Sequence, residues 1–352
     1  MWFKNLIIFQ LTESFKVDIE TFENSLAEHK FHPCQSIDPI SMGWTSPIGI
    51  EEGTLVHHAN GYSMVCLKIE EKIVPVGVIK EMLDEKVEEV ELRENRKVRK
   101  KEKDALKDEI YHSLLPRAFS KHSFIYGYID LKANLLVIDA ASSKKAEILT
   151  VQLRKALGSL KIQTPDVITI PTLLTKWLAE NKYPNDLVIE DNCVLKDPDD
   201  NSGTIRCQRQ NLLSGEIAQL IENGREVIQM GLTWRDQIGF VIKEDFSVRS
   251  VKFLEVLQDQ ANDIFTETES ERFDADFAIM TESLHEFIIY LFEIFGNEPL
   301  KVKHIDSEIK TTNLVENIEN KENNQSEITV ESLMPENIKN IEQTKEADIK
   351  ED

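Results

Sequence analysis

Hydrophobic and polar positions follow two different periods along the chain, one typical of strands and the other of helices. Short apolar or alternating runs that predict strands lie at residues 6–9, 62–69 and 124–140. Between the first two runs, residues 18–30 carry apolar side chains at every third or fourth position, which predicts an amphipathic helix. The start of the chain therefore indicates a fold of the α+β class.

Predicted strands and helices continue to alternate up to about residue 251. We expect a hairpin that turns at Lys132–Asn134, then a helix over 143–157 that ends at Gly158. Further helices are predicted over 172–180 and 214–223, and further strands over 187–195 and 203–209. The strongest amphipathic pattern runs from Asp276 to Phe295, so this helix should lie in the core. Mixed sheets covered by helices are the expected architecture.

Residues 75–115 have a different pattern, because a few regularly spaced apolar residues stand among many charged ones. Apart from Gly77 this stretch has no internal Gly or Pro, which predicts one long helix that Pro116 would end. A helix this polar cannot be buried on most of its sides. We expect it to project from the body, as a long basic helix within a projection over about residues 77–123.

The last part of the chain changes composition again. Residues 301–352 consist mainly of Asn, Glu, Lys, Gln, Ser and Thr, with isolated aliphatic residues and no aromatic one. Such a segment cannot bury enough surface to offset the entropy cost of ordering. The expected organisation is therefore one folded unit over 1–300 and an acidic, disordered tail over 301–352.

Composition bounds the function without deciding it. The 352 residues have a formal net charge of −22, which taken alone argues against a nucleic-acid partner. Segregated positive charge can overrule that total, because the Debye length at physiological salt is only about 8 Å. No apolar run is long enough to span a membrane and the first residues lack the layout of a signal peptide, so we expect a cytoplasmic protein.

Motifs of common enzyme sites are missing from the sequence, including GxxxxGK[ST], GxGxxG, HExxH, GxSxG and the EF-hand loop. The four cysteines are scattered and form no CxxC, so we interpret them as free thiols. His57–His58 and the pair Asp274 and Asp276 could in principle hold a metal, but a strand edge and a helix start are the better explanation of both. We expect no metal, no cofactor and no enzymatic activity.

The densest positive segment lies between Arg93 and Lys107. On a single helix, six of its cations would fall mostly on one broad side, and such a stripe could follow DNA phosphates. These cations are Arg93, Arg96, Lys97, Lys100, Lys101 and Lys107. The alternative is a solvated helix, because several glutamates precede them at the spacing of i, i+4 ion pairs.

A resemblance to a known family appears in this same region. Residues 100–109 and 112–120 resemble the most characteristic stretch of the RdgC family, and other stretches agree in order and spacing. They are residues 2–6, 42–44, 58–61, 70–75, 143–147, 153–160, 258–260 and 272–277. The resemblance covers about residues 1–297.

Membership of that family would imply a homodimer that closes into a ring around duplex DNA. Binding would be to the backbone and independent of sequence, and nucleoid association would follow. The implied role is to restrain RecA-type strand exchange in recombination and replication-fork repair. The alternative is a protein that acts mainly by direct contact with a recombinase, with DNA binding secondary.

The resemblance also assigns residues. Phe119 matches the apolar contact at the ring opening, and Arg209 with Gln210 matches the second dimer contact; the alternative for Phe119 is a small local core. The expected DNA-binding residues, all of them cationic, are Arg93, Arg96, Lys97, Arg99, Lys100, Lys101, Lys103, Lys107, Arg117, Lys121 and Arg209.

Overall fold

The computed structural model describes residues 2–50, 53–198 and 203–300. Two compact units share this part of the chain. The larger unit contains the residues up to Phe31, Gly43–Lys68 and the chain from Phe124 onward, and the smaller unit contains His32–Met42 and Ile69–Ser123. The predicted tail, 301–352, lies outside the described residues, as do residues 199–202.

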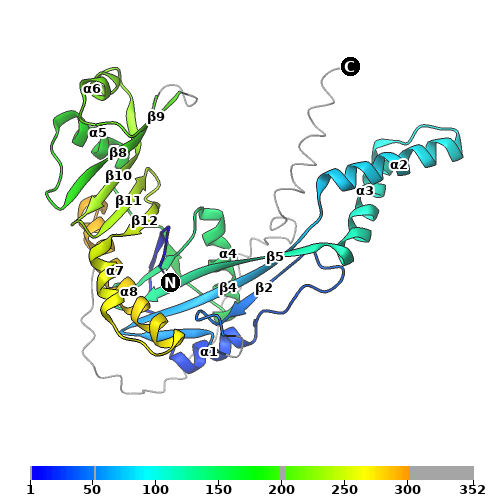
Figure 1. The fold of residues 1–352 in the computed structure, drawn as a ribbon, viewed down its shortest axis with the longest axis horizontal. Helices are drawn as coiled ribbons and strands as arrows, with labels where there is room; N and C mark the ends of the chain where they lie inside the picture. Colours follow the sequence, from blue (N-terminus) through cyan, green and yellow to red (C-terminus); the bar gives the residue numbers. More distant parts are fainter. Residues whose placement is uncertain (1, 51–52, 199–202, 301–352) are drawn as a thin grey trace. The chain divides into compact units, whose positions relative to one another are not determined.

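A seven-stranded sheet has the order β2-β4-β5-β6-β1-β7, with β3 also paired to β4. Its strands β2, β4 and β5 are labelled in Figure 1. Its strands are β1 (Ile7–Leu11), β2 (Ile40–Thr45), β3 (Val56–Ala59), β4 (Tyr62–Ile73), β5 (Phe119–Asp130), β6 (Leu135–Ile138) and β7 (Ile162–Gln163). The predicted hairpin is confirmed, because β5 and β6 pair in antiparallel register from Gly127 opposite Ile138 to Asp130 opposite Leu135. Asn134 in the turn has a left-handed φ of 52°, which asparagine tolerates well.

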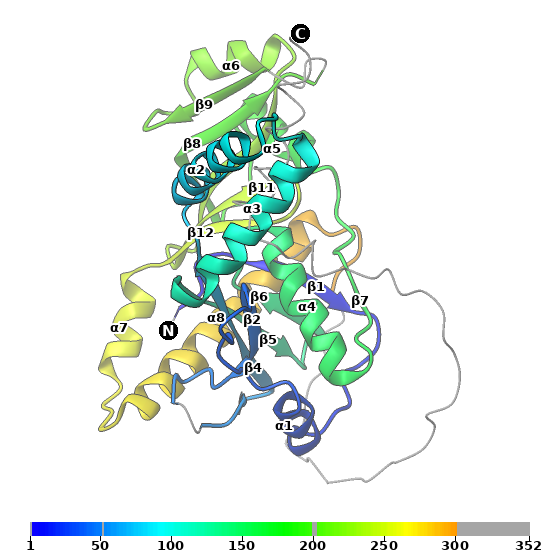
Figure 2. The ribbon, with the colours of Figure 1, turned by 90° about the vertical axis from the view of Figure 1, so that its right-hand side faces the viewer.

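Helices cover both faces of this sheet in the larger unit (Figure 2). One face carries α1 (Ile19–Ala27) and α4 (Ser143–Leu157), and the other carries α8 (Glu269–Phe295). The capping residues explain where these helices begin: the Asp18 carboxylate accepts the Thr21 amide, and the Ser142 hydroxyl accepts the Lys145 amide. Gly158 ends α4 with a φ of 72°, as the sequence predicts.

A second, five-stranded sheet of the larger unit has the order β12-β11-β10-β8-β9. Its strands are β8 (Leu187–Lys196), β9 (Thr204–Gln208), β10 (Glu226–Trp234), β11 (Ile238–Lys243) and β12 (Val248–Phe253). The accompanying helices are α5 (Ile170–Glu180), α6 (Gly215–Glu222) and α7 (Glu255–Asp263). The predicted strands and helices of this region are confirmed within a few residues at each end.

The helix α8 belongs to the core of both sheets. Near its middle, the buried Met280 sulfur accepts the Phe3 amide at 3.2 Å, beside the first sheet. Near its end, the Phe287 ring lies 5.5 Å from Trp234 and 4.8 Å from Phe240 of the second sheet. The predicted helix start at Asp276 was wrong: Thr268 caps α8 by accepting the Glu271 amide, and Glu269 is its first residue.

The smaller unit contains a helical hairpin in place of the predicted single helix. The prediction was wrong because Asn95 adopts the left-handed conformation, with φ 50° and ψ 39°, and ends the first helix. The helices are α2 (Val76–Glu94) and α3 (Lys100–Leu114), followed by the short 3-10 helix η1 (Leu115–Arg117). Their thin apolar stripes face each other, and buried Ile79, Leu83 and Ile110 form the seam.

Candidate nucleic-acid interface

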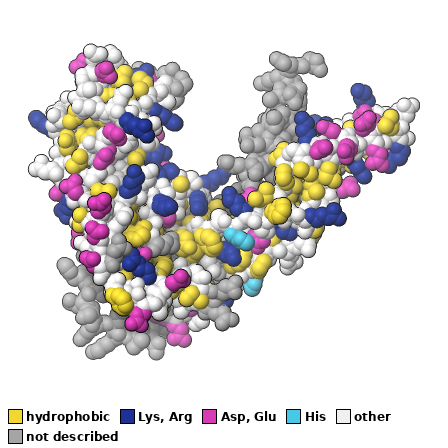
Figure 3. All heavy atoms as spheres, in the orientation of Figure 1, with side chains coloured by type: hydrophobic (Ala, Val, Ile, Leu, Met, Phe, Trp, Pro, Cys, Tyr) yellow, Lys and Arg dark blue, Asp and Glu magenta, His cyan; other side chains and the backbone are white. Residues whose placement is uncertain are grey.

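Positive charge in the smaller unit is concentrated at the turn between α2 and α3. Residues 96–103 contain six Lys and Arg side chains against one acidic side chain, Glu102. By contrast, α2 carries seven acidic and three basic side chains. We call residues 95–103 the hairpin tip. Figure 3 shows acidic and basic side chains close together on the hairpin. The residue counts place the excess of cations at the tip.

Ion pairs hold the backbone of the hairpin tip. The Arg96 guanidinium bridges two carboxylates, with its Nε 2.7 Å from Glu94 and its two terminal nitrogens 2.7 and 2.8 Å from Glu102. The Val98 amide donates to the Glu91 carboxylate at 2.9 Å. Hydrogen bonds from Arg93 and Arg96 hold the pKa of Glu94 below its ordinary value, and those from Arg96 do the same for Glu102. The Arg96 side chain is therefore engaged in the ion pairs that hold the turn.

Other cations of the hairpin tip face solvent. Lys97, Lys100 and Lys101 are exposed and make no ion pair within the described residues. Lys103 lies 3.9 Å from Asp84 of α2, at the limit of an ion pair. The predicted stripe along one helix was wrong, because the turn at Asn95 separates Arg93 from the cations of α3. Instead of a stripe, the cations form a compact group at the turn between α2 and α3.

Phe119 stands at the start of a strand and not on a loop tip. It is the first residue of β5 and 84% of its surface is exposed, so the alternative of a small local core is wrong. Lys121, two residues on, projects from the same face of the strand. Arg117, in η1, is exposed as well. This short segment therefore presents an aromatic ring beside cations.

Arg209 and Gln210 lie in the larger unit, directly after β9. Both side chains are exposed, and the Gln210 amide donates to the Asp191 carbonyl at 3.2 Å. Arg209 has a φ of 55°, a conformation that costs most residues about a kilocalorie per mole or more. Because β9 is the last strand of its sheet, its outer edge offers backbone groups for pairing with another chain.

The histidines and aspartates considered as metal ligands do not gather into a site. His57 lies 3.4 Å from Asp274, and its ring packs edge-on against Phe273 and Phe277 at 5.0 and 4.8 Å. Burial lowers the His57 pKa, which favours the neutral ring. In the part of the chain that the structure describes, no three His, Cys, Asp or Glu side chains could hold a metal ion together.

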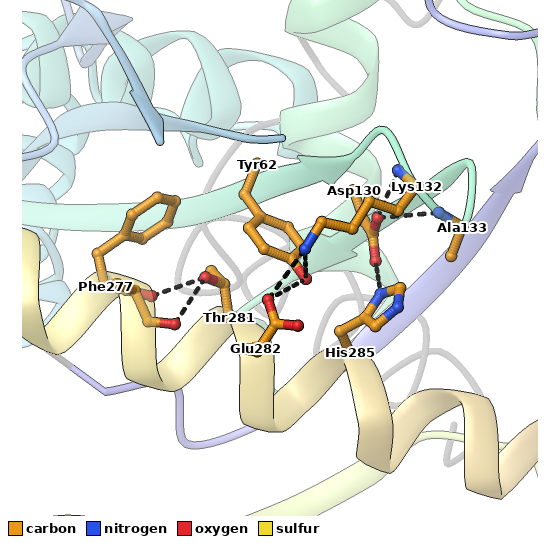
Figure 4. A network of polar contacts seen from close by, with 9 residues as sticks. Tyr62, Asp130, Lys132, Ala133, Phe277, Thr281, Glu282 and His285 are labelled. Carbon is orange, nitrogen blue, oxygen red and sulfur yellow. Dashed lines mark hydrogen bonds and ion pairs between the residues drawn. The ribbon is translucent and has the colours of Figure 1, made fainter. Parts of the chain in front are cut away.

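A buried pair joins α8 to the turn between β5 and β6 (Figure 4). Asp130 is 1% exposed, and one of its oxygens accepts the amides of Lys132 and Ala133 at 2.8 and 2.9 Å. Its other oxygen lies 2.5 Å from Nδ1 of His285, which is 8% exposed. Sequence reasoning missed this pair because its members are 155 positions apart and belong to no motif.

The same turn makes a second polar contact with α8. Lys132 reaches the Glu282 carboxylate at 3.0 Å and the Tyr62 hydroxyl at 3.2 Å, and the Tyr62 hydroxyl donates to Glu282 at 3.0 Å (Figure 4). Burial alone would raise the pKa of Glu282, but the hydrogen bonds from Lys132 and Tyr62 outweigh it and lower the pKa. We interpret the whole network as structural, because it fixes the hairpin turn on α8.

Comparison with known proteins identifies the family. A family model described as "Putative exonuclease, RdgC" matches residues 1–298. The chain belongs to the RdgC family. Among the relatives, the "Recombination-associated protein RdgC" of Psychromonas ingrahamii is 42% identical over 299 residues, and that of Aeromonas hydrophila subsp. hydrophila is 41% identical over 299. The Yersinia pestis protein of the same name is 41% identical over 300 residues.

Each of these three matches covers 85% of this chain and 99% of the relative. The resemblance seen in the sequence is thereby confirmed. The α+β class is confirmed separately, by the sheets and helices of the structure. The family description contains the words putative exonuclease, whereas the relatives' names contain no catalytic activity. None of the described helices is long and apolar enough to cross a membrane.

Proposed function

We propose that this RdgC-family protein binds double-stranded DNA through the phosphate backbone, without reading its sequence. The observation that carries the proposal is the hairpin tip, where six cations stand against one carboxylate in an otherwise acidic protein. Lys97, Lys100 and Lys101 are exposed there and are free to contact phosphates. Exposed lysines at a turn favour contacts with phosphates, which carry no sequence information.

The proposed assembly is a homodimer that closes into a ring around the duplex. Two surfaces support it, each within its own unit: the exposed Phe119 ring at the start of β5, and the outer edge of β9 with Arg209 and Gln210. An exposed aromatic ring and an unpaired strand edge are both features that proteins usually cover with a partner. The proposed DNA-facing residues remain those named from the sequence, with Arg96 as a support of the tip.

The proposed cellular role is to coat or encircle DNA and so restrain RecA-type strand exchange in recombination and fork repair. The relatives' name, recombination-associated protein, agrees with such a role. The second candidate is a protein that acts mainly by touching a recombinase. The two differ in one respect, because only the first needs tight binding to DNA when no recombinase is present.

The test is a titration of unrelated duplexes with the purified protein, in the absence of any recombinase, over a series of salt concentrations. We expect similar affinities on all duplexes and a steep, linear fall of log affinity with log salt, with a slope of about −0.9 for each phosphate contact. Absence of binding at low salt would contradict the proposal and favour the second candidate.

We propose binding without cleavage, although the family description mentions an exonuclease. The same duplexes, labelled at one end and incubated with Mg²⁺ or Mn²⁺, should keep their length. Shortening that depends on the divalent ion, and that stays with the protein through purification, would show that the protein is an enzyme.

Phe119→Ser should weaken the dimer and leave the fold intact. Because the ring is 84% exposed, its loss removes an apolar contact between subunits without opening a cavity in the core. We expect the dimer dissociation constant, measured by sedimentation, to rise about tenfold or more, with little change in Tm. Phe265→Ser is the matched control, because Phe265 is 86% exposed and lies in the other unit. An unchanged dissociation constant for Phe119→Ser would show that Phe119 is not at an interface.

A further inference from the structure

The larger unit contains a cleft that the proposed DNA binding does not use. Its volume is about 570 Å³, which falls in the range of ligand-binding sites. Two stretches far apart in the sequence border it: Trp2–Lys4 at the start of the chain, and Val251–Ala261, which runs from the end of β12 into α7. Arg272 of α8 completes the lining.

The floor of the cleft is apolar and aromatic. Phe3 is fully buried, and Val251 and Phe253 are 6% and 5% exposed. The Trp2 ring packs against Phe253 with centroids 4.6 Å apart, in a tilted arrangement. A large apolar side chain entering the cleft would replace water on this surface, which is favourable by about 25 cal/mol per Å² of area covered.

Hydrogen bonds hold the walls in place. The Gln258 amide nitrogen donates to the Phe253 carbonyl at 2.7 Å, which fixes α7 to the end of β12. The Arg272 guanidinium donates to the Ala261 carbonyl at 2.9 Å and lies 3.4 Å from Asp276. Because both polar side chains bond to neighbouring parts of the wall, they hold the cleft in a preformed shape.

The rim of the cleft is positively charged. Lys4 and Lys252 are exposed and make no side-chain ion pair in the described part of the chain. Among the described residues that line the cleft, Glu255 is the single acidic one. A cleft with an apolar floor and a cationic rim is complementary to a ligand that carries a large apolar group next to carboxylates.

From this arrangement we infer that the cleft binds a short acidic peptide segment of a partner protein, with one large apolar side chain inserted over Trp2 and Phe253. Its carboxylates would lie against Lys4 and Lys252. A single DNA strand stacked on Trp2 fits less well, because the floor is aliphatic as well as aromatic. The site would let the protein hold a protein partner through one unit.

The probe is a fluorescent peptide of several glutamates followed by leucine and phenylalanine, titrated with the full chain and followed by anisotropy. We expect saturable binding that is lost when alanine replaces both apolar residues of the peptide. The double variant Lys4→Glu and Lys252→Glu should weaken binding about tenfold or more. The matched control, Lys176→Glu and Lys182→Glu, changes the same charge at exposed positions outside the cleft and should have no effect.

Two results would overturn the inference. The first is no binding of the peptide, or equal binding by the cleft variant and its control. The second is displacement of the peptide by a single-stranded oligothymidine whose own binding falls in the cleft variant, because the cleft would then be a stacking platform for nucleic acid. The affinity of the same variants for duplex DNA is measured as well, which distinguishes this test from that of the proposed function. A variant that loses peptide binding and keeps duplex binding supports a separate site.

Discussion

A variant with glutamine in place of Lys97, Arg99, Lys100 and Lys101 is expected to bind duplex DNA about ten- to a thousand-fold more weakly near 0.1 M salt. Each phosphate contact releases condensed counterion, so the slope of log affinity against log salt should flatten by about two to four units. The loss should be similar on unrelated duplexes, because phosphates carry no sequence information. Glutamine is nearly as good a helix former as lysine or arginine, so α3 should persist.

Two controls in the same hairpin make this experiment specific. Lys80→Gln with Lys86→Gln removes exposed cations from the acidic part of α2 and should change affinity little. Arg96→Gln breaks the bridge between Glu94 and Glu102 and should loosen the turn without removing a phosphate contact. Unchanged affinity and slope in a folded, dimeric tip variant would reject the tip as the DNA-facing surface. Exposed Lys144, Arg154 and Lys155 of α4, with the partly exposed Lys145, would then be the next cations to test.

Asp130→Ala is expected to lower the Tm by roughly 6 to 20 °C, which corresponds to a loss of about 3–5 kcal/mol in a unit of this size. The substitution leaves the amides of Lys132 and Ala133 without their acceptor and leaves His285 without its buried partner. Unpaired buried polar groups cost far more than the average hydrogen bond contributes. Thermal melting followed by circular dichroism measures the effect.

Asp130→Asn is the matched variant for that prediction, because its amide oxygen can still accept the two turn amides, while an uncharged NH2 donor replaces the oxygen that faces His285. It should recover most of the lost Tm if the network is structural, and DNA affinity should follow the folded fraction in both variants. Equal melting of Asp130→Ala and the wild type would show that the turn does not depend on the pair.

Much of the fold could be predicted from local patterns. The β5–β6 hairpin, α1 and α4 are confirmed, because each has its own turn or cap signal, such as Asp18, Asn134 or Gly158. The start of α8 was placed seven residues late, since its polar first turns hide the cap at Thr268. The contacts of α8 with both sheets have no local signal at all.

The hairpin tip shows why the candidate site was harder to predict. The break at Asn95 follows no Gly or Pro, and its one signal is that asparagine tolerates the left-handed conformation. The buried positions Ile79, Leu83 and Val90 of α2 follow the spacing of a helix. Leu92 does not continue this pattern, because its side chain is 77% exposed. The cations themselves could be found from the sequence. Which of them are occupied, as Arg96 is, depends on side-chain geometry that spacing does not determine.

The position of α8 in the chain also has a consequence for how the protein is made. The Phe3 amide bonds to Met280, 277 positions later, and β1 pairs with β6 more than a hundred positions later. The strands that leave the ribosome first therefore have no complete core to join until the helix that closes it has been synthesised. Contacts of such long range slow folding and leave apolar strand faces exposed in the meantime. Nascent chains that stop before Glu269 should therefore need chaperones, whereas chains that include Phe295 should fold without them.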